Sequence, residues 1–235
     1  MTREQRLARF GGRGLPELTP DLTVLPQAQA DLWPRLGDIP EEFVLYGGTA
    51  LALRLGHRTS VDFDFFADDP FAPGDLLDRI APLGRPEVVL MRESTLVVIE
   101  PGGVQLSFFG GMGLQAVAEP SLVAVNGLLV ASAADLAATK AKALLDRSEW
   151  KDYVDIATLL RHGHRLAHIC GYAAAVFDRR FVFPVPELLR ALVWFADGTA
   201  PDVPPAIRAE LVAAVRSMDL ADIPLVEPYL PGVLP

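Results

Sequence analysis

Cysteine is almost absent from this chain, since Cys170 stands alone among 235 residues. One thiol excludes a disulfide framework and a cysteine-based zinc site. Long apolar runs are missing as well. No uncharged run reaches the roughly 20 residues that a membrane-spanning helix needs, and Asn126-Gly127 interrupts the run from Pro120 to Ala134. The N-terminal stretch carries positive charge without an apolar segment behind it, which argues against a signal peptide. We therefore expect a cytoplasmic protein that does not engage a membrane.

Basic residues are in the minority, with 21 Lys and Arg against 30 Asp and Glu and a net charge of -9. This balance argues against electrostatic binding of nucleic acid by the whole surface of the molecule. A local basic patch remains compatible with the net charge. Six residues of the C-terminal half are candidates for such a patch: Arg161, His162, His164, Arg165, Arg179 and Arg180. We favour the alternative, a scattered and solvated face. The proportions of 51% hydrophobic and 22% charged residues are those of an ordinary globular chain.

Hydrophobic periodicity divides the chain into a strand-rich part and a helix-rich part. The predicted strands are 42–46, 61–67, 87–91, 95–100 and 104–109, followed by a hairpin pair, 122–125 and 128–130, around Asn126-Gly127. The predicted helices are 28–36, 49–55 with Thr49 as the N-cap, 73–83, 133–147 and 149–162. We therefore expect an α+β fold with an N-terminal extension (1–41), an α/β core (42–131) and a helical C-terminal region (132–235).

Two aspartates lie in the middle of an apolar strand, Val-Asp-Phe-Asp-Phe-Phe, at positions 61–66. Because side chains alternate along a strand, Asp62 and Asp64 share one face while Phe63 and Phe65 share the other. Two carboxylates this close repel each other unless a cation lies between them, and Mg²⁺ is the usual cation of an all-oxygen site. The alternative is a solvated strand edge, which we would favour for an isolated D-x-D tripeptide.

The residues before this strand favour the metal site over the solvated strand edge. Gly47-Gly48-Thr49 lies between a predicted strand and a predicted helix. In this arrangement, backbone N–H groups and the positive end of the helix dipole can bind phosphate. His57-Arg58 follows the helix, and Ser60 adjoins the aspartate strand. A tight turn with an ordinary N-cap is the alternative for the glycines, but a phosphate cradle, a cation and paired carboxylates in this order indicate nucleotide chemistry.

A second signal comes from two later helices. Ser132 and Asp135 form a capping box, and at 100° per residue Lys140 falls on the core-facing stripe. Lys142 falls on the solvated side together with Asp135 and Glu149. In the next helix Asp152 and Asp155 share a face with apolar residues. Buried charges need partners, so we expect either internal ion pairs, Lys140–Asp152 or Arg147–Asp155, or a shared pocket with Asp62 and Asp64.

The ordered set "YGGTALALRLGHRTSVDFDFF", "VQLSFF", "ASAADLAATKAKALLDR" and "KDYVDIATLL" resembles the AbiEii-type nucleotidyltransferase toxins of bacterial toxin–antitoxin and phage-defence systems, over about residues 42 to 162. The resemblance implies a nucleotidyltransferase fold with a mixed sheet and flanking helices. It implies that Gly47, Gly48 and Thr49 contact the triphosphate of an NTP, that Asp62 and Asp64 hold Mg²⁺ or Mn²⁺, and that Lys140 is the third-motif lysine. The fourth-motif acid is Asp152 or Asp155. We add His57, Arg58 and Ser60 to the expected nucleotide-binding residues.

One departure concerns the metal site. Many nucleotidyltransferases carry a third metal-binding acid on a following strand, but Val104-Gln-Leu-Ser-Phe-Phe109 has none, and Gln105 and Ser107 would ligate only weakly. The expected reaction is attack of an RNA 3′-terminal hydroxyl, notably of tRNA, or of a protein hydroxyl on the α-phosphorus of an NTP, in a toxin that has a cognate antitoxin. The missing acid motivates an alternative, a catalytically lapsed nucleotide-binding module that acts through a protein partner. A glycosyltransferase with a D-x-D metal site ranks below both.

Overall fold

The computed structural model describes residues 14–177 and 182–229, which form two compact units. The sheet unit comprises residues 14–113 and 119–132. The helical unit comprises residues 114–118, 133–177 and 182–229. Among the described helices, none is both long and apolar enough to cross a membrane.

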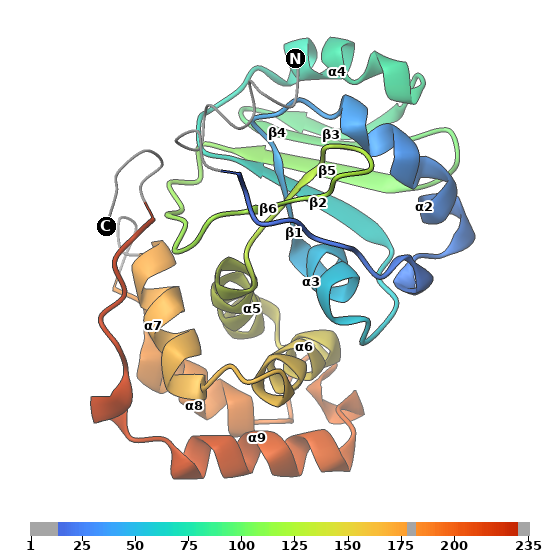
Figure 1. Cartoon of the computed structure of the whole chain (residues 1–235). Coiled ribbons are helices and arrows are strands. Elements are labelled where there is room, and N and C mark those ends of the chain that lie inside the picture. Colours follow the sequence, from blue (N-terminus) through green and yellow to red (C-terminus); the bar gives the residue numbers. More distant parts are fainter. Residues whose placement is uncertain (1–13, 178–181, 230–235) are drawn as a thin grey trace. The chain divides into compact units, whose positions relative to one another are not determined.

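The sheet unit is built on one mixed sheet of seven strands in the order β3-β4-β5-β2-β1-β7-β6 (Figure 1). The strands are β1 (Val44–Tyr46), β2 (Asp62–Ala67), β3 (Glu87–Arg92), β4 (Thr95–Ile99), β5 (Gln105–Gly110), β6 (Ser121–Leu122) and β7 (Leu129–Val130). Strand β2 is central and runs antiparallel to β1 and parallel to β5. The predicted mixed sheet is confirmed, and the predicted hairpin at Asn126-Gly127 joins β6 to β7.

The two faces of β2 differ in burial. Phe63 and Phe65 are fully buried, and the ring of Phe65 stacks on that of Phe108 in β5 with 5.1 Å between the centroids. Phe63 also lies beside the ring of Trp33, 6.3 Å away. Asp62 and Asp64 on the other face are partly exposed. The alternation predicted from the sequence is therefore present, and it leaves the carboxylate face of the strand accessible.

Helices of the sheet unit begin and end close to the predicted positions. They are η1 (Leu22–Val24), α2 (Gln27–Leu32), η2 (Trp33–Asp38), α3 (Gly47–Leu55), α4 (Pro73–Arg79) and η3 (Ala81–Leu83). Three predictions need correction. The predicted helix 28–36 ends as a 3₁₀ segment, since Pro34 lacks the N–H that an α-helix needs there. The predicted helix 73–83 ends at Arg79 and is followed by a 3₁₀ segment that contains Pro82, for the same reason. Helix α3 begins at Gly47 with Tyr46 as its N-cap residue, so the prediction of Thr49 as the N-cap is wrong.

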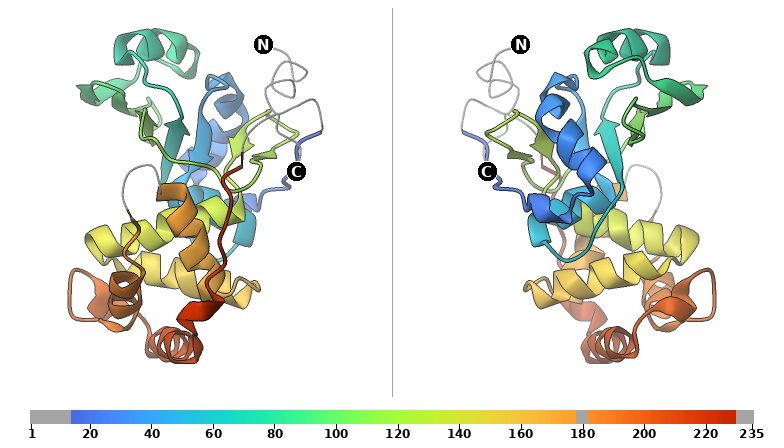
Figure 2. Two further views of the ribbon diagram at one scale, coloured as in Figure 1. Left: turned by 90° about the vertical axis from the view of Figure 1, so that its left-hand side faces the viewer. Right: turned by 90° about the vertical axis from the view of Figure 1, so that its right-hand side faces the viewer.

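The helical unit is organised around α5 (Ala133–Arg147), which packs against α6 (Trp150–Arg161), α7 (Leu166–Phe177) and α8 (Val185–Val193). Helix α9 (Pro205–Ser217) packs against α6 and α8, as the two views of Figure 2 show. Helix α5 begins directly after Ser132, where the sequence predicted its start. Asp135, however, is buried instead of solvated, because its Oδ1 accepts a hydrogen bond from the backbone N–H of Val117 at 2.7 Å.

Candidate active site

Asp64 lies against the turn that opens α3. The register of the sheet pairs Asp64 with Tyr46, the residue before Gly47. A Cβ atom on Gly47 would lie 2.3 Å from Oδ2 of Asp64, and the backbone of Gly47 has a φ of +76°. Any other residue would therefore clash with the carboxylate and strain the backbone. Gly47 is required because it brings a carboxylate and a helix N-terminus into close approach.

Gly48 brings two further predicted residues to the same place. A Cβ atom on Gly48 would lie 2.6 Å from Nη2 of Arg58 and 3.0 Å from Oγ of Ser60. Arg58 also donates from Nη1 to the carbonyl oxygen of Thr59 at 3.1 Å. The loop between α3 and β2, in which His57 is partly buried, therefore sets a guanidinium and a hydroxyl directly over the first turn of α3. A cation and N–H donors beside a carboxylate suit a bound phosphate.

Thr49 has a different environment from the one expected of a phosphate ligand. Its side chain is fully buried, and its hydroxyl donates to the backbone carbonyl oxygen of Asp62. The bond ties the third residue of α3 to the first residue of β2. Thr49 therefore fixes the distance between the helix N-terminus and the aspartate strand, and only its backbone N–H would face a ligand.

The neighbouring strand β5 supplies amide and hydroxyl groups beside the carboxylates. Gln105 is in register with Asp62, and Ser107 is in register with Asp64. Nε2 of Gln105 donates to Oγ of Ser107 at 3.3 Å, which confirms that the two side chains share a face. In the described part of the chain, no group of three or more His, Cys, Asp or Glu side chains is placed to hold a metal ion. The carboxylates of this face are therefore a pair.

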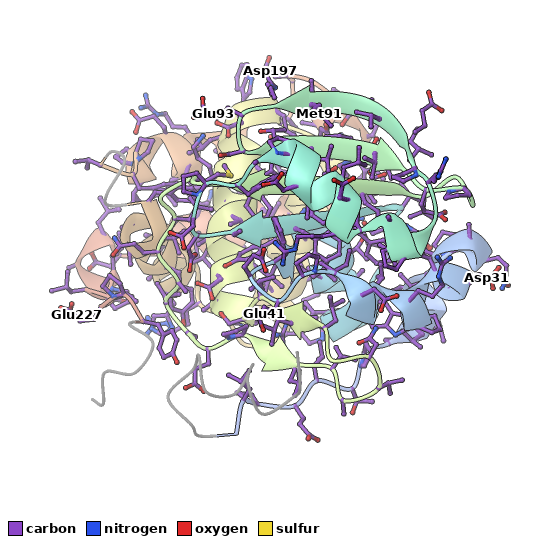
Figure 3. The ribbon with its side chains drawn as sticks, turned by 90° about the horizontal axis from the view of Figure 1, so that it is seen from above. Asp31, Glu41, Met91, Glu93, Asp197 and Glu227 are labelled. Atoms are coloured by element: carbon purple, nitrogen blue, oxygen red, sulfur yellow. The ribbon has the colours of Figure 1, made fainter. Side chains whose placement is uncertain are left out.

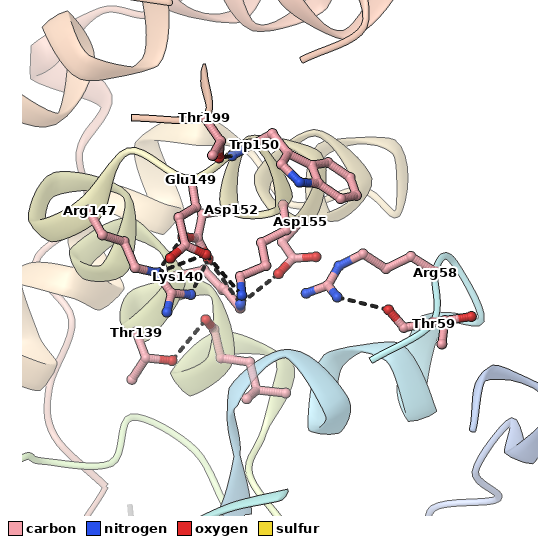
Figure 4. Close-up of polar contacts among 12 residues, drawn as sticks. Arg58, Thr59, Thr139, Lys140, Arg147, Glu149, Trp150, Asp152, Asp155 and Thr199 are labelled. Atoms are coloured by element: carbon pink, nitrogen blue, oxygen red, sulfur yellow. Dashed lines mark hydrogen bonds and ion pairs between the residues drawn. The ribbon is translucent and has the colours of Figure 1, made fainter. Parts of the chain in front are cut away.

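The helical unit contains a separate cluster of buried charge around Lys140 (Figure 4). Nζ of Lys140 lies 3.1 Å from Oδ1 of Asp152 and 2.6 Å from Oδ2 of Asp155, and the side chains are 3%, 0% and 0% exposed. One ammonium thus bridges two carboxylates that α6 presents one turn apart. The predicted inward direction of Lys140 and its ion pair with Asp152 are confirmed.

Arg147 completes this cluster by binding Asp152. Its Nε lies 2.8 Å from Oδ2, and its Nη2 donates to Oδ1 at 2.9 Å. The sequence suggested an ion pair between Arg147 and Asp155. Instead, the guanidinium of Arg147 binds both carboxylate oxygens of Asp152. The arginine side chain is 42% exposed, so it covers the buried acid from the solvent side. Lys142 forms an ion pair with Asp146 on the outer side of α5, as its helical position predicted.

The two aspartates of α6 differ in what their oxygens already accept. Asp152 accepts a hydrogen bond from Lys140 and two from Arg147. A carboxylate offers about four acceptor sites, so Asp152 has little capacity left for a substrate. Asp155 is held by Lys140 through Oδ2. Both acids therefore share the ammonium of Lys140, and Asp152 is bound by Arg147 in addition.

Tyr153, between these acids, anchors α6 within the helical unit. Its hydroxyl donates to the backbone carbonyl oxygens of Ala191 at 3.2 Å and Trp194 at 2.9 Å. Burial raises the pKa of Tyr153, and the hydrogen bond with Ser148 offsets part of that rise. The phenol therefore stays a neutral donor, and its role is to hold α6 against the end of α8.

One residue near the site escaped sequence reasoning. Gln29 of α2 is 2% exposed, and its Nε2 donates to the backbone carbonyl oxygen of Ser60 at 3.1 Å. It supports the loop that carries Arg58. A signal was present in the sequence, because Gln29 stands at the helical spacing of Leu32, Trp33 and Leu36, which form a buried stripe. An amide on such a stripe must hydrogen-bond inside the protein.

The candidate basic patch is largely neutralised where it can be described. Arg161 forms an ion pair with Glu210 at 2.6 Å, and Arg165 pairs with Asp222 at 2.9 Å. Arg179 and Arg180 lie outside the described residues. The described members of the patch thus favour the alternative of a solvated face.

Comparison with known proteins agrees with this geometry. The family model described as "Nucleotidyl transferase AbiEii toxin, Type IV TA system" matches residues 35–224. An uncharacterised protein of Aquifex aeolicus (strain VF5) is 32% identical over 162 residues, which cover 68% of this chain and 76% of that protein. Among solved structures, the nucleotidyltransferase toxin MenT4 from Mycobacterium tuberculosis H37Rv is similar with a TM-score of 0.52 and 17% identity, over 94% of this chain and 92% of that one. The chain belongs to the AbiEii family of nucleotidyltransferase toxins of type IV toxin–antitoxin systems.

Proposed function

We propose that this nucleotidyltransferase transfers NMP from an NTP to a hydroxyl group of RNA, notably the 3′ end of tRNA, or of protein, in a reaction that requires Mg²⁺. The observation that carries the proposal is the approach of Asp64 to Gly47, which joins a partly exposed carboxylate pair to the N-terminus of α3. Carboxylates hold a hard cation and a helix N-terminus holds phosphate, so together they suit a metal-bound triphosphate.

Asp62 and Asp64 fit a magnesium ion by the chemistry of their donor atoms. Mg²⁺ is commonly held by one or two carboxylates together with water and substrate phosphates, so a pair without a third acid is sufficient. The hydroxyl of Ser107 and the amide of Gln105, beside them in register, are weaker oxygen donors to such an ion or to its water ligands. When bound, the ion would neutralise charge on the phosphate oxygens. Mn²⁺ would meet the same donors.

The triphosphate is expected at the start of α3. The backbone N–H groups of Gly47, Gly48 and Thr49 belong to the first turn and have no partner within the helix. Arg58 and Ser60 lie over the same turn and would contact phosphate oxygens from above. His57 belongs to the same loop and would also contact the triphosphate. These residues would bind and orient the leaving pyrophosphate and stabilise its charge.

We propose that residues of α5 and α6 serve the same reaction. Lys140 would stabilise negative charge of the triphosphate, and Asp152 or Asp155 would orient the acceptor hydroxyl or take its proton. The contacts within the helical unit support a joint role for these residues, because Lys140 bridges both carboxylates and Arg147 binds Asp152. Both acids would also hold Lys140 in position.

The biological role follows from the family. We propose that the chain acts in the cytoplasm as the toxin of a bacterial toxin–antitoxin or phage-defence system and that a cognate antitoxin opposes it. Modification of tRNA or of an essential protein would stop growth. Expression without the antitoxin is expected to inhibit growth, and the inhibition should disappear when Asp64 is replaced by Asn.

Label transfer tests the proposal directly. The purified chain is incubated with each α-³²P-labelled NTP, Mg²⁺, and either total RNA or total cell protein. Label is expected in one acceptor fraction with one or more NTPs, and both EDTA and Asp64→Asn should abolish it. No transfer from any NTP to either fraction would contradict the proposal.

The absence of a carboxylate on β5 favours one alternative, a lapsed enzyme that binds nucleotide and acts through a protein partner. Calorimetric titration separates the two functions. Saturable NTP binding with no transfer and no growth inhibition would support the lapsed enzyme. Binding together with transfer supports the active one.

A further inference from the structure

The carboxylate face of the sheet continues beyond the aspartates as an aromatic surface. Registered partners on neighbouring strands point to the same face. One row across the sheet contains Asp64, with Tyr46 on β1 and Ser107 on β5. The next row contains Phe66, with Phe109 on β5 and then Thr95 on β4 and Arg92 on β3. We call this second row, Phe66, Phe109, Thr95 and Arg92, the acceptor row.

The rings of this surface touch one another and remain partly exposed. The centroids of Phe66 and Phe109 are 5.3 Å apart with an interplanar angle of 36°, and those of Tyr46 and Phe66 are 5.0 Å apart. All three residues are only partly buried, whereas Phe63, Phe65 and Phe108 on the opposite face are fully buried. The sheet therefore keeps a set of aromatic rings accessible on the face that carries the carboxylates.

The direction of the reaction places the acceptor on this row. In an in-line displacement the attacking oxygen and the leaving oxygen lie on opposite sides of the phosphorus. The pyrophosphate side is the start of α3, because Gly47 and Gly48 follow β1 at the Asp62 end of β2. The opposite side is the Phe66 end, about 6.6 Å along the strand from Asp64. With the triphosphate at the start of α3 as proposed, the attacking group would lie over Phe66 and Phe109.

We infer that Phe66 and Phe109 form a stacking platform for the terminal nucleobase of an RNA acceptor, with Arg92 placed for a phosphate of the preceding nucleotide. The inference rests on the proposed function and names its acceptor class, RNA instead of protein. In the attack, a ribose hydroxyl oxygen forms a bond to the α-phosphorus while the bond from phosphorus to the bridging oxygen breaks. Pyrophosphate leaves with that electron pair, and the hydroxyl proton passes to a base.

The chemistry of the acceptor row suits the end of an RNA strand. Single-stranded ends are recognised by stacking of their splayed bases on aromatic side chains, a sequence-tolerant contact that acts together with positive charge along the backbone. Arg92 would supply such a charge locally, which is compatible with a net charge of -9 for the whole chain. Arg92 is exposed at the end of the row, about 10 Å from Phe109 across two strand spacings. Figure 3 labels its neighbours Met91 and Glu93 in the β3–β4 hairpin.

A fluorescent base tests the platform without any transfer reaction. The probe is a single-stranded oligoribonucleotide with 2-aminopurine as its 3′-terminal base, titrated with the full chain in the absence of NTP. The wild type should quench the 2-aminopurine fluorescence as the base stacks. Phe66→Leu and Phe109→Leu should each lose the quenching and bind the probe about 10-fold or more weakly. Phe66→Tyr keeps a ring and should keep the quenching.

Phe71→Leu is the matched control, because the ring of Phe71 contacts Phe43 on the opposite side of the sheet, 5.2 Å away. It should quench like the wild type. Calorimetric NTP affinity should be unchanged in both platform variants. Equal quenching in wild type and platform variants would overturn the inference, and so would a parallel fall in NTP affinity, which would assign the rings to the donor base.

Two further outcomes separate this inference from the proposed function. Lost quenching in the variants, with no label transfer from any NTP in the wild type, would support the platform and contradict the enzymatic proposal. Label transferred to protein alone, with no probe binding, would overturn the platform and leave the enzyme intact. If a leucine variant melts early, crosslinking of a 3′-terminal 4-thiouridine probe to the wild type replaces it. Crosslinks at Phe66 or Phe109 support the platform, and crosslinks only elsewhere overturn it.

Discussion

The carboxylates of the sheet unit and those of the helical unit have opposite surroundings. Asp62 and Asp64 lie partly exposed on an open strand face, beside glycines that clear space around them. Asp152 and Asp155 are fully buried and share the ammonium of Lys140. Mutual repulsion in the first pair favours binding of a cation from solution, whereas the second pair already has its cation within the fold. A sequence motif therefore does not reveal whether its carboxylate binds a cation from solution or a cationic side chain of the protein.

The sharpest way to test this contrast is Asp64→Asn. The change keeps the size of the side chain and removes one of two repelling charges, so the melting temperature should stay the same or rise slightly. Transfer should fall by about 10³-fold or more, because a metal ligand contributes several kcal/mol of transition-state stabilisation. A thermal melt is measured beside the transfer assay. Loss of stability together with activity would show that Asp64 is a structural acceptor instead.

Lys140→Ala, unlike Asp64→Asn, should lower the stability of the protein. It leaves two buried carboxylates without their shared ammonium, so the free energy of unfolding should fall by about 3 to 5 kcal/mol. Lys142→Ala is the matched control, since its ion pair with Asp146 is on the outer side of α5 and should change stability by less than about 0.5 kcal/mol. Urea unfolding measures both. A Lys140→Ala protein as stable as the wild type would contradict the structural role of the buried cluster.

A rescue experiment sharpens the same contrast. Apolar replacement of a buried pair is often neutral, which suggests Lys140→Met with Asp152→Leu. The structure predicts that this double variant recovers stability only in part, because Asp155 also loses Lys140 and Arg147 loses Asp152. Adding Asp155→Asn should recover more. Full recovery by the double variant alone would show that the Lys140–Asp155 contact contributes nothing.

Thr49→Val tests how the two elements of the sheet-unit site are held together. Valine has nearly the same shape, but it removes the hydrogen bond to the carbonyl oxygen of Asp62. The partly buried carbonyl loses a donor, so stability should fall by about 1 to 3 kcal/mol. Activity should fall through misplacement of Asp62, with the catalytic rate affected more than the KM for NTP. Thr49→Ser, which keeps the hydroxyl, should recover the rate.

Local patterns predicted the elements and the direction of most site residues. The period of 3.6 placed α5 at Ala133–Arg147 with Lys140 inward, and the period of 2 placed Asp62 and Asp64 on one face. Such patterns failed where a partner comes from far along the chain. Thr49 was assigned as a helix cap because capping is local, yet its hydroxyl binds the strand that follows.

Asp135 shows the same limit of local reasoning. Helical geometry placed it on the side of α5 opposite to the core stripe, which suggested solvent. The segment 114–118, distant from α5 in any periodic pattern, joins the helical unit and its Val117 N–H binds the Asp135 carboxylate. Which segment covers a helix face is a tertiary fact, and periodicity on that helix contains no information about it.

The smallest expected effect concerns His164, a titratable group that belongs to neither carboxylate pair. Burial lowers its pKa, and the nearby charges of His162 and His168 lower it further. In the unfolded chain the imidazole is protonated near pH 6.5. In the folded protein it is protonated only at a lower pH. The unfolded state thus binds more protons between the two pKa values, and stability falls as the pH drops through that window. Above about pH 6.5 this contribution is constant.

Urea unfolding at a series of pH values checks this expectation. His164→Gln removes the ionisable group and should flatten the part of the profile below about pH 6.5, at some cost from the lost ring contact with Tyr172 at 6.4 Å. An identical slope for wild type and His164→Gln would mean that the imidazole is solvated in the folded protein.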